Sequence, residues 1–305
     1  MNELNLPPLK EFDARIIQRP LQGIFRNMEF ELLRRVQTAN ASSDVEGERR
    51  STLFVMMLQF TKNSYGAANF LCSTEDDASN RKENFALVLP PINRQLLDLL
   101  FTLVYILDDF PTRSMDYERS GYRQAREEYD KYRKKFGSDP AWQSRFKVQE
   151  DWFPGVERYL SITKEQKANP KLIRRWLGPA KLKEKQTRSQ PFMQFLDEWI
   201  YKEVSAQAHL NAAGLLSVGL FLLTDLAPEG QRVPVHRALQ AYTFWHYART
   251  LTVVLGIASE IDTFAKVGNR EALVRLWVML GDHALEAKEV YEQRYQAMLT
   301  PDHAD

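Results

Sequence analysis

The chain has 305 residues, 41 Lys and Arg against 40 Asp and Glu, one cysteine, and a hydrophobic share of 44%. These figures allow one large domain or two smaller ones. They exclude a disordered chain, which would be poorer in apolar residues and further from neutrality. They also exclude a disulfide scaffold, because Cys72 has no second cysteine to pair with. A lone thiol fits a reducing compartment, and residues 1–10 hold no apolar core of signal-peptide length, so we expect a cytoplasmic protein.

Helical periodicity marks the first part of the chain. One face of a helix over 21–36 is predicted by apolar residues three and four positions apart, namely Leu21, Ile24, Phe25, Met28, Leu32 and Val36. A second helix is predicted from residue 52 to about 71. Turn-forming residues predict a loop over 40–48 between these helices, and the polar segment 73–84 predicts another loop.

Capping residues and prolines set the expected boundaries further along. Pro90 and Pro91 begin a helix that runs to about residue 108, since proline is well accepted in a first turn. A polar, charge-rich segment follows over 114–136 and stops at Gly137. The pairs Asp139-Pro140 and Asn169-Pro170 each join a capping residue to a first-turn proline.

The remaining helices are predicted at 190–226, as one long helix or two abutting ones, at 234–264, and at 270–299 with Asn269 as its cap. No segment alternates apolar and polar residues as a strand would. We therefore predict an all-α fold, a multi-helix bundle with long central apolar helices. We expect one domain over 1–305 with an insertion-like polar segment at about 111–190; two domains divided there are the alternative.

The longest apolar stretch covers residues 212–224. At about 13 residues it is shorter than the ~20 needed to cross a bilayer, so we expect a buried core helix and no membrane partner. A second apolar run, over 251–261, predicts another buried helix.

Charge is distributed unevenly along the chain. Residues 111–190 hold 20 Lys and Arg against 11 Asp and Glu, whereas the rest is acidic. A basic run with an aromatic residue can hold a nucleic-acid backbone and stack a base. The candidate RNA-binding residues are Lys171, Arg174, Arg175, Trp176, Lys181, Lys183, Lys185 and Arg188. We favour the alternative, a solvated helical face or a surface that docks on the acidic remainder.

Polar residues lie in a stripe on the otherwise apolar helix at 92–108. Arg94, Asp98, Thr102 and Tyr105 fall within an arc of about 80° at 100° per residue. Because an unpaired buried charge costs several kcal/mol, we expect Arg94 to pair with Asp98 one turn away.

Two later helices carry similar stripes. Tyr201, Ser205 and His209 follow one another at steps of four, and Tyr242, His246, Arg249 and Glu260 share another helix face. One hypothesis is that the three stripes converge on a pocket. Asp98 would anchor charge there, His209 or His246 would act as general acid or base, and Arg94 or Arg249 would bind an anion. The alternative, which we favour, is a structural network that fixes helix register.

Established catalytic motifs are absent from the sequence. It contains no phosphate-binding loop, no zinc signature, no nucleophile elbow and no Glu-x-x-His pair, so we expect no metal and no cofactor. The ribonuclease motif of HEPN domains, an Arg followed after four to six residues by His, is also missing.

A resemblance rests on two segments. Arg94-Gln-Leu-Leu-Asp98 resembles the Arg-x-x-x-Glu/Asp start of a central apolar helix in an uncharacterised family of all-helical bacterial proteins. The segment from Tyr201 through Ser205 to His209 is similar to that family's Tyr-x-x-x-Ser-x-x-x-His segment. The resemblance covers about a third of the chain and implies a bundle HEPN-like in outline, often found in toxin or antiviral systems. It implies Arg94, Asp98, Tyr201, Ser205 and His209 as a shared cluster.

Two functions are compatible with these observations. The first, which we favour, is a non-enzymatic helical scaffold, sensor or partner-binding module in a bacterial defence or stress system, with a protein partner or a second copy bound. The second is a metal-independent, HEPN-like ribonuclease that uses a split Arg/His pair, with RNA as its partner. In the second, His209 would move the proton, Arg94 would stabilise the charged phosphorus intermediate, and the basic segment would hold the RNA.

Overall fold

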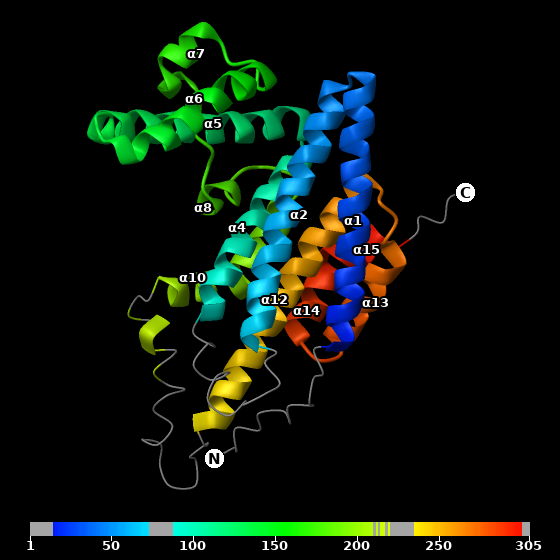
Figure 1. The fold of residues 1–305 in the computed structure, drawn as a ribbon. Coiled ribbons are helices and arrows are strands. Elements are labelled where there is room, and N and C mark those ends of the chain that lie inside the picture. Colours follow the sequence, from blue (N-terminus) through cyan, green and yellow to red (C-terminus); the bar gives the residue numbers. More distant parts are fainter. Residues whose placement is uncertain are drawn as a thin grey trace. The chain divides into compact units, whose positions relative to one another are not determined.

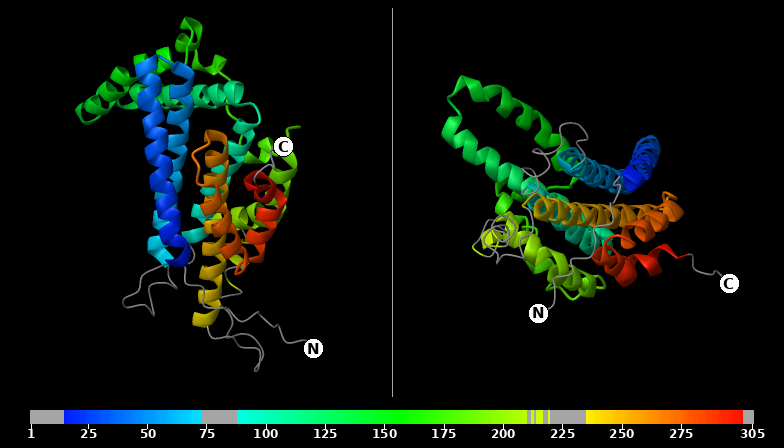
Figure 2. Two further views of the ribbon diagram at one scale, coloured as in Figure 1. Left: turned by 90° about the vertical axis from the view of Figure 1, so that its right-hand side faces the viewer. Right: turned by 90° about the horizontal axis from the view of Figure 1, so that it is seen from below.

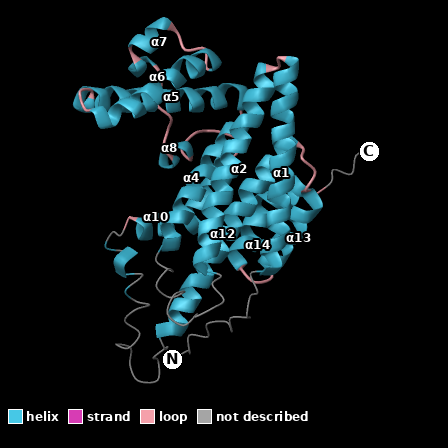
Figure 3. Ribbon diagram, in the orientation of Figure 1, coloured by secondary structure: helices cyan, strands magenta, loops and turns pink. Residues whose placement is uncertain are grey.

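The computed structural model describes residues 15–72, 88–209, 212, 214–216, 219 and 235–300. In these ranges every regular element is a helix (Figures 1 and 3). The predicted all-α fold class is therefore confirmed. The predicted loop at 73–84 lies outside the described residues.

The chain divides into two compact units. The first combines residues Met1–Val104 with Arg188–Asp305, and the second is formed by Tyr105–Thr187. The second unit covers most of the polar, basic segment at about 111–190. The two units are described separately below.

The first unit begins with a helical hairpin of α1 (Arg15–Ser42) and α2 (Val45–Cys72), whose helices run side by side (Figure 1). Both predicted helices are confirmed, but the predicted loop at 40–48 is wrong, because the turn contains only residues 43 and 44. Ser43 adopts the left-handed conformation with φ 58°. The Asp44 carboxylate then accepts the Gly47 amide at 3.0 Å and caps the start of α2.

Helix α12 (Val235–Ala265) forms the centre of this unit and contacts α2, α13 (Arg270–Gly281) and α14 (Leu285–Val290) (Figure 2). Its residues 251–261 are buried as predicted. A Cβ at Gly256 would lie 2.9 Å from the Tyr295 hydroxyl oxygen and 3.3 Å from Leu100, so only glycine permits this packing.

The C-terminal helix predicted as one element over 270–299 is interrupted. Helix α13 ends at Gly281, and Ala284 is extended, with φ −134°. The chain then continues as α14, the π-helical turn η5 (Tyr291–Tyr295) and α15 (Gln296–Leu299). The break after Gly281 lets α14 pack closely against the end of α13, since a Cβ at Gly281 would lie 3.3 Å from the Cβ of Lys288. Asn269 precedes α13 as predicted, but its side chain makes no cap and donates to Asp262 instead.

Helix α4 (Leu89–Leu107) matches the predicted helix at about 90–108. The segment predicted at 190–226 instead begins as α9 (Gln190–Leu196), the π-helical turn η3 (Asp197–Tyr201) and α10 (Lys202–Ala208). Most of the apolar run at 212–224 lies outside the described residues. Leu215 and Leu216, which are described, are 55% and 68% exposed, so the predicted burial is wrong for these two residues.

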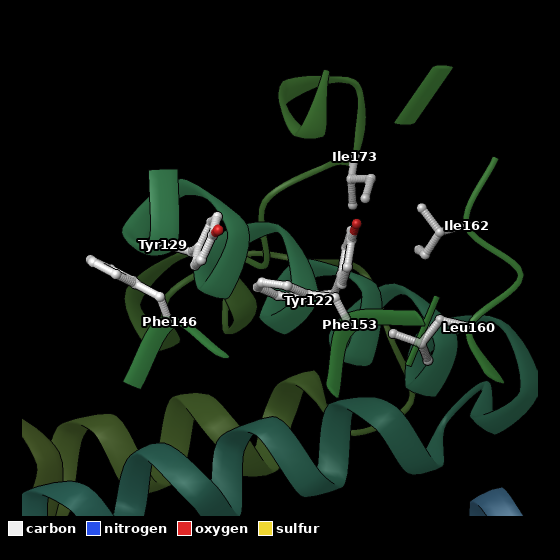
Figure 4. Packing of buried hydrophobic residues seen from close by; sticks show 7 residues of the cluster. All are labelled: Tyr122, Tyr129, Phe146, Phe153, Leu160, Ile162 and Ile173. Atoms are coloured by element: carbon white, nitrogen blue, oxygen red, sulfur yellow. The ribbon is translucent and has the colours of Figure 1, made fainter. Parts of the chain in front are cut away.

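The second unit is built on α5 (Phe110–Phe136), α6 (Pro140–Tyr159) and the short elements α7 (Lys164–Ala168), η2 (Pro170–Leu172) and α8 (Pro179–Leu182). Its core is largely aromatic and consists of Tyr122, Tyr129, Phe146, Phe153, Leu160, Ile162 and Ile173 (Figure 4). As predicted, Asp139 and Asn169 accept backbone N–H groups at the starts of α6 and η2.

Candidate functional site

Five of the predicted site residues lie together in the first unit and are called the Arg94 cluster: Arg94, Asp98, Tyr201, Ser205 and His209. Arg94 and Asp98 lie one turn apart on α4, and the other three follow at steps of four along η3, α10 and the residue after it. Helix α4 is apolar on most of its surface and is therefore buried. Its polar stripe then lies at the boundary with η3 and α10. The rings of Phe101 and Tyr201 contact each other across that boundary at 5.1 Å.

Arg94 is the centre of the cluster. Its Nε donates to Asp98 Oδ1 at 3.1 Å, which confirms the predicted pair. Its Nη1 lies 2.9 Å from both Ser205 Oγ and His209 Nε2. The guanidinium carbon sits 4.5 Å from the centre of the Tyr201 ring. One cation thus joins α4 to three turns of the opposite segment.

Tyr201 and His209 take defined hydrogen-bonding roles in this arrangement. Arginine only donates, so His209 Nε2 accepts and the neutral ring carries its proton on Nδ1. The Tyr201 hydroxyl donates to Asp98 Oδ1 at 2.9 Å. Burial and the nearby Asp98 carboxylate raise the Tyr201 pKa well above its usual value, so the phenol stays protonated as a donor.

A second polar cluster surrounds Arg249, whose side chain is only 1% exposed. Its Nη2 donates to Glu203 and to Glu286, each at 2.8 Å, and its Nε donates to Glu286 at 2.8 Å. Its guanidinium carbon lies 3.8 Å from the centre of the Trp245 ring. Burial alone would lower the Arg249 pKa, but the bonds to Glu286 and Glu203 outweigh it and raise that pKa.

His246 lies one turn before Arg249 and is completely buried. Among the residues that the structure describes, neither ring nitrogen has a hydrogen-bond partner, and the centre of the ring lies 4.3 Å from that of the Tyr242 ring. Burial, with a smaller effect of the Arg249 charge, lowers the His246 pKa to about 3. The ring is therefore neutral in the folded protein near pH 7.

The predicted stripes contribute to two clusters, one around Arg94 and one around Arg249, whereas Glu260 of the third stripe pairs with Arg294. Ser205 faces Arg94 whereas Glu203 faces Arg249, because positions two apart on a helix point about 200° apart. Arg249, the alternative to Arg94 as the predicted anion-binding residue, is paired with the carboxylates of Glu203 and Glu286. Tyr105 instead contacts Trp176 and Arg113, with its ring 4.1 Å from the Arg113 guanidinium carbon.

The eight candidate RNA-binding residues do not belong to one unit, because Arg188 is in the first unit and the others are in the second. Arg175 forms an ion pair with Glu127 at 2.7 Å. The half-buried Trp176 meets the rings of Tyr105 and Tyr117 edge to face at 5.6 and 5.1 Å. Lys171, Arg174, Lys181 and Lys185 are exposed, and Lys183 is half-buried. A role of this set in RNA binding stays a prediction.

The sequence analysis did not identify Glu203, Glu286 or Asn93. The first two balance Arg249, and the Asn93 amide donates to the His246 carbonyl at 2.8 Å and accepts from Thr250. One signal was available, because an arginine beside the long apolar run of a helix requires a carboxylate from another element. The sequence could not say which carboxylate.

Among the helices described, none is both long enough and apolar enough to span a bilayer. Comparisons with protein-family models, curated proteins and solved structures return no match. The resemblance of the two Arg94-cluster segments to a bacterial helical family therefore stays a prediction.

Proposed function

We propose that this chain is a non-enzymatic helical scaffold module that assembles with a second copy of itself through the outward face of α2. The observation that carries the proposal is a stripe of uncharged, exposed residues on that face. The α2 stripe consists of Met56, Phe60, Asn63, Ala67 and Phe70.

The α2 stripe has the spacing of a helix-pairing seam. Its steps of four, three, four and three are those of the a and d positions of a heptad repeat. Met56, Phe60 and Phe70 are 52%, 41% and 70% exposed, and Asn63 and Ala67 are also exposed. Contiguous apolar side chains on an exposed helix face are typical of interaction sites.

Charge argues for a second copy as the occupant. Between residues 51 and 72 the only charged residue is Lys62, which pairs with Glu29 on the neighbouring α1. A face without charge can form no ion pair with a charged partner helix, whereas it can pack against another uncharged face. In an antiparallel pair, Phe60 of each copy can lie opposite Phe70 of the other, with Asn63 opposite Ala67 between them.

The geometry of the Arg94 cluster supports a structural role for it. Asp98 already neutralises Arg94, and its carboxylate would repel a phosphate at the same place. Ser205 and the Tyr201 ring occupy further sides of the guanidinium. These contacts are those of a clamp that fixes α10 on α4. The expected place in a bacterial defence or stress system stays a prediction.

Sedimentation equilibrium of the full chain tests the assembly. We expect a dimer for the wild type and a monomer for Phe60→Glu and for Phe70→Lys, because each variant buries a charge opposite an aromatic ring. The double variant Phe60→Glu/Phe70→Lys should recover the dimer, since each Glu then faces a Lys of the other copy.

A matched control is Phe30→Glu, which places the same charge on the exposed face of α1, where Phe30 is 65% exposed. It should remain dimeric. A monomeric wild type, or a dimer that survives both single substitutions with unchanged affinity, contradicts the proposal. Circular dichroism of each variant separates loss of assembly from loss of folding.

One observation favours the ribonuclease as a second candidate. Arg94 Nη1 and His209 Nε2 are 2.9 Å apart, and His209 is exposed, so one phosphate could reach both side chains. If the chain is this enzyme, labelled RNA should be cleaved by the wild type and not by His209→Ala or Arg94→Ala. Equal cleavage by all three proteins indicates a contaminant, and an intact RNA with the wild type contradicts this candidate.

A further inference from the structure

A cavity of about 420 Å³ lies in the first unit between the C-terminal half of α1, the start of α2 and the end of α12. It is called the α1–α2 cavity. Its volume is that of a site for a small organic molecule, for which 300–1,000 Å³ is typical. It lies apart from the Arg94 and Arg249 clusters and shares no residue with the α2 stripe.

The floor of the cavity is apolar. Leu32 and Phe54 are buried beneath it, and Phe264 closes one side with 36% of its surface exposed. The Phe54 and Phe264 rings meet edge to face at 5.6 Å. Because Leu32 and Phe54 are already buried, an apolar or aromatic body would cover the exposed part of the Phe264 ring on binding.

The rim of the cavity is cationic. Arg34, Arg35, Arg50 and Lys266 line it, against the single carboxylate of Asp44. Asp44 is already engaged by the Gly47 amide, and Arg34 pairs with Glu31 at 2.8 Å outside the cavity. Arg50 and Lys266 form no ion pair with any residue that the structure describes. The rim therefore has cationic charge that no part of the described protein neutralises.

Arg35 is held in place before any ligand binds. Its two terminal nitrogens donate to the carbonyl groups of Ala265 and Lys266 at the end of α12, the second at 3.1 Å. Lys266 itself has a left-handed backbone, with φ 51°, and so turns the chain at the cavity edge. Because both terminal nitrogens of Arg35 already donate to backbone carbonyls, Arg50 and Lys266 are the rim cations better placed to bind an anion directly.

We propose that the α1–α2 cavity binds a small organic anion, with an apolar body against the exposed part of Phe264 and a carboxylate or sulfonate between Arg50 and Lys266. The site does not depend on the proposed assembly through α2. The two anchoring cations come from different helical elements, so binding would also tie α2 to the end of α12.

Calorimetric titration with 1-naphthoate tests the site, with 1-naphthalenemethanol as the neutral probe of the same body. We expect 1-naphthoate to bind the wild type at least tenfold more tightly than the alcohol. The variant Arg50→Gln/Lys266→Gly should weaken 1-naphthoate at least tenfold and leave the alcohol unchanged. Glycine suits residue 266 because its φ is positive, so the cation is removed without backbone strain.

The matched control is Arg26→Gln, which removes an exposed cation of α1 that does not line the cavity. It should bind 1-naphthoate like the wild type. Equal affinity of the wild type for the acid and the alcohol, or unchanged binding by the double variant, overturns the proposal. So does an absence of 1-naphthoate binding by folded wild-type protein.

Discussion

Replacing Arg249 by methionine should destabilise the protein by about 3 kcal/mol, the low end of the range for breaking a buried ion pair by removal of one partner. The substitution keeps an unbranched apolar stem but removes the guanidinium group, so it leaves the Glu203 and Glu286 carboxylates without their shared cation. Glu286 is 20% exposed and Glu203 is 34% exposed, so water relieves part of the cost. Urea unfolding at pH 7, followed by circular dichroism, measures the change in the free energy of unfolding.

Two further variants identify the cause. Adding Glu203→Gln and Glu286→Gln to Arg249→Met removes the stranded charges and should recover much of the lost stability. Arg34→Met breaks an exposed pair, since the Arg34 side chain is 57% exposed, and should cost less than about 1 kcal/mol. If Arg249→Met and Arg34→Met unfold at the same urea concentration, Arg249 is not the anchor that the structure indicates.

The sequence alone predicts the helices well where burial and periodicity agree. The long α1, α2, α4 and α12 follow from apolar residues three and four apart and from first-turn prolines. The predictions failed at the breaks. The turn at 43–44 is closed by local hydrogen bonds, such as that from the Asp44 amide to the Ala39 carbonyl, and Gly281 lies against Lys288 just beyond the second break; neither feature is visible in the spacing of apolar residues.

The candidate site shows the same division. The Arg94–Asp98 pair lies within one helix turn, so spacing alone predicts it. Contact of Arg94 with Ser205 and His209 joins residues more than 100 positions apart, and the sequence suggested it only as a hypothesis, through the polar stripes and the resemblance of the two segments. The counter-ions of Arg249 come from two further helices, and the sequence offers many exposed carboxylates that could have served equally.

His246 should make the protein sensitive to acid. Burial holds its pKa in the folded state at about 3, whereas an exposed histidine of the unfolded chain has a pKa of about 6.5. Between pH 6.5 and 3 the unfolded chain therefore binds a proton at His246 that the folded protein does not bind. Stability from this group is fully present above pH 6.5 and falls as the pH drops toward 3.

The expected size of this effect is large. Within that window the free energy of unfolding should fall by up to about 1.4 kcal/mol per pH unit through this residue, or roughly 5 kcal/mol in total. His246→Leu removes the titrating ring and should make the free energy of unfolding depend less steeply on pH between 6.5 and 3. Near pH 7 it should cost little, because neither ring nitrogen has a hydrogen-bond partner to lose in the part of the chain that the structure describes. Urea unfolding of both proteins at pH values from 7 to 4 measures the difference in slope, with the exposed His283→Leu as the control. Parallel pH profiles of the free energy of unfolding for wild type and His246→Leu would show that proton uptake by His246 does not drive acid unfolding, since the carboxylates of the protein contribute equally to both curves.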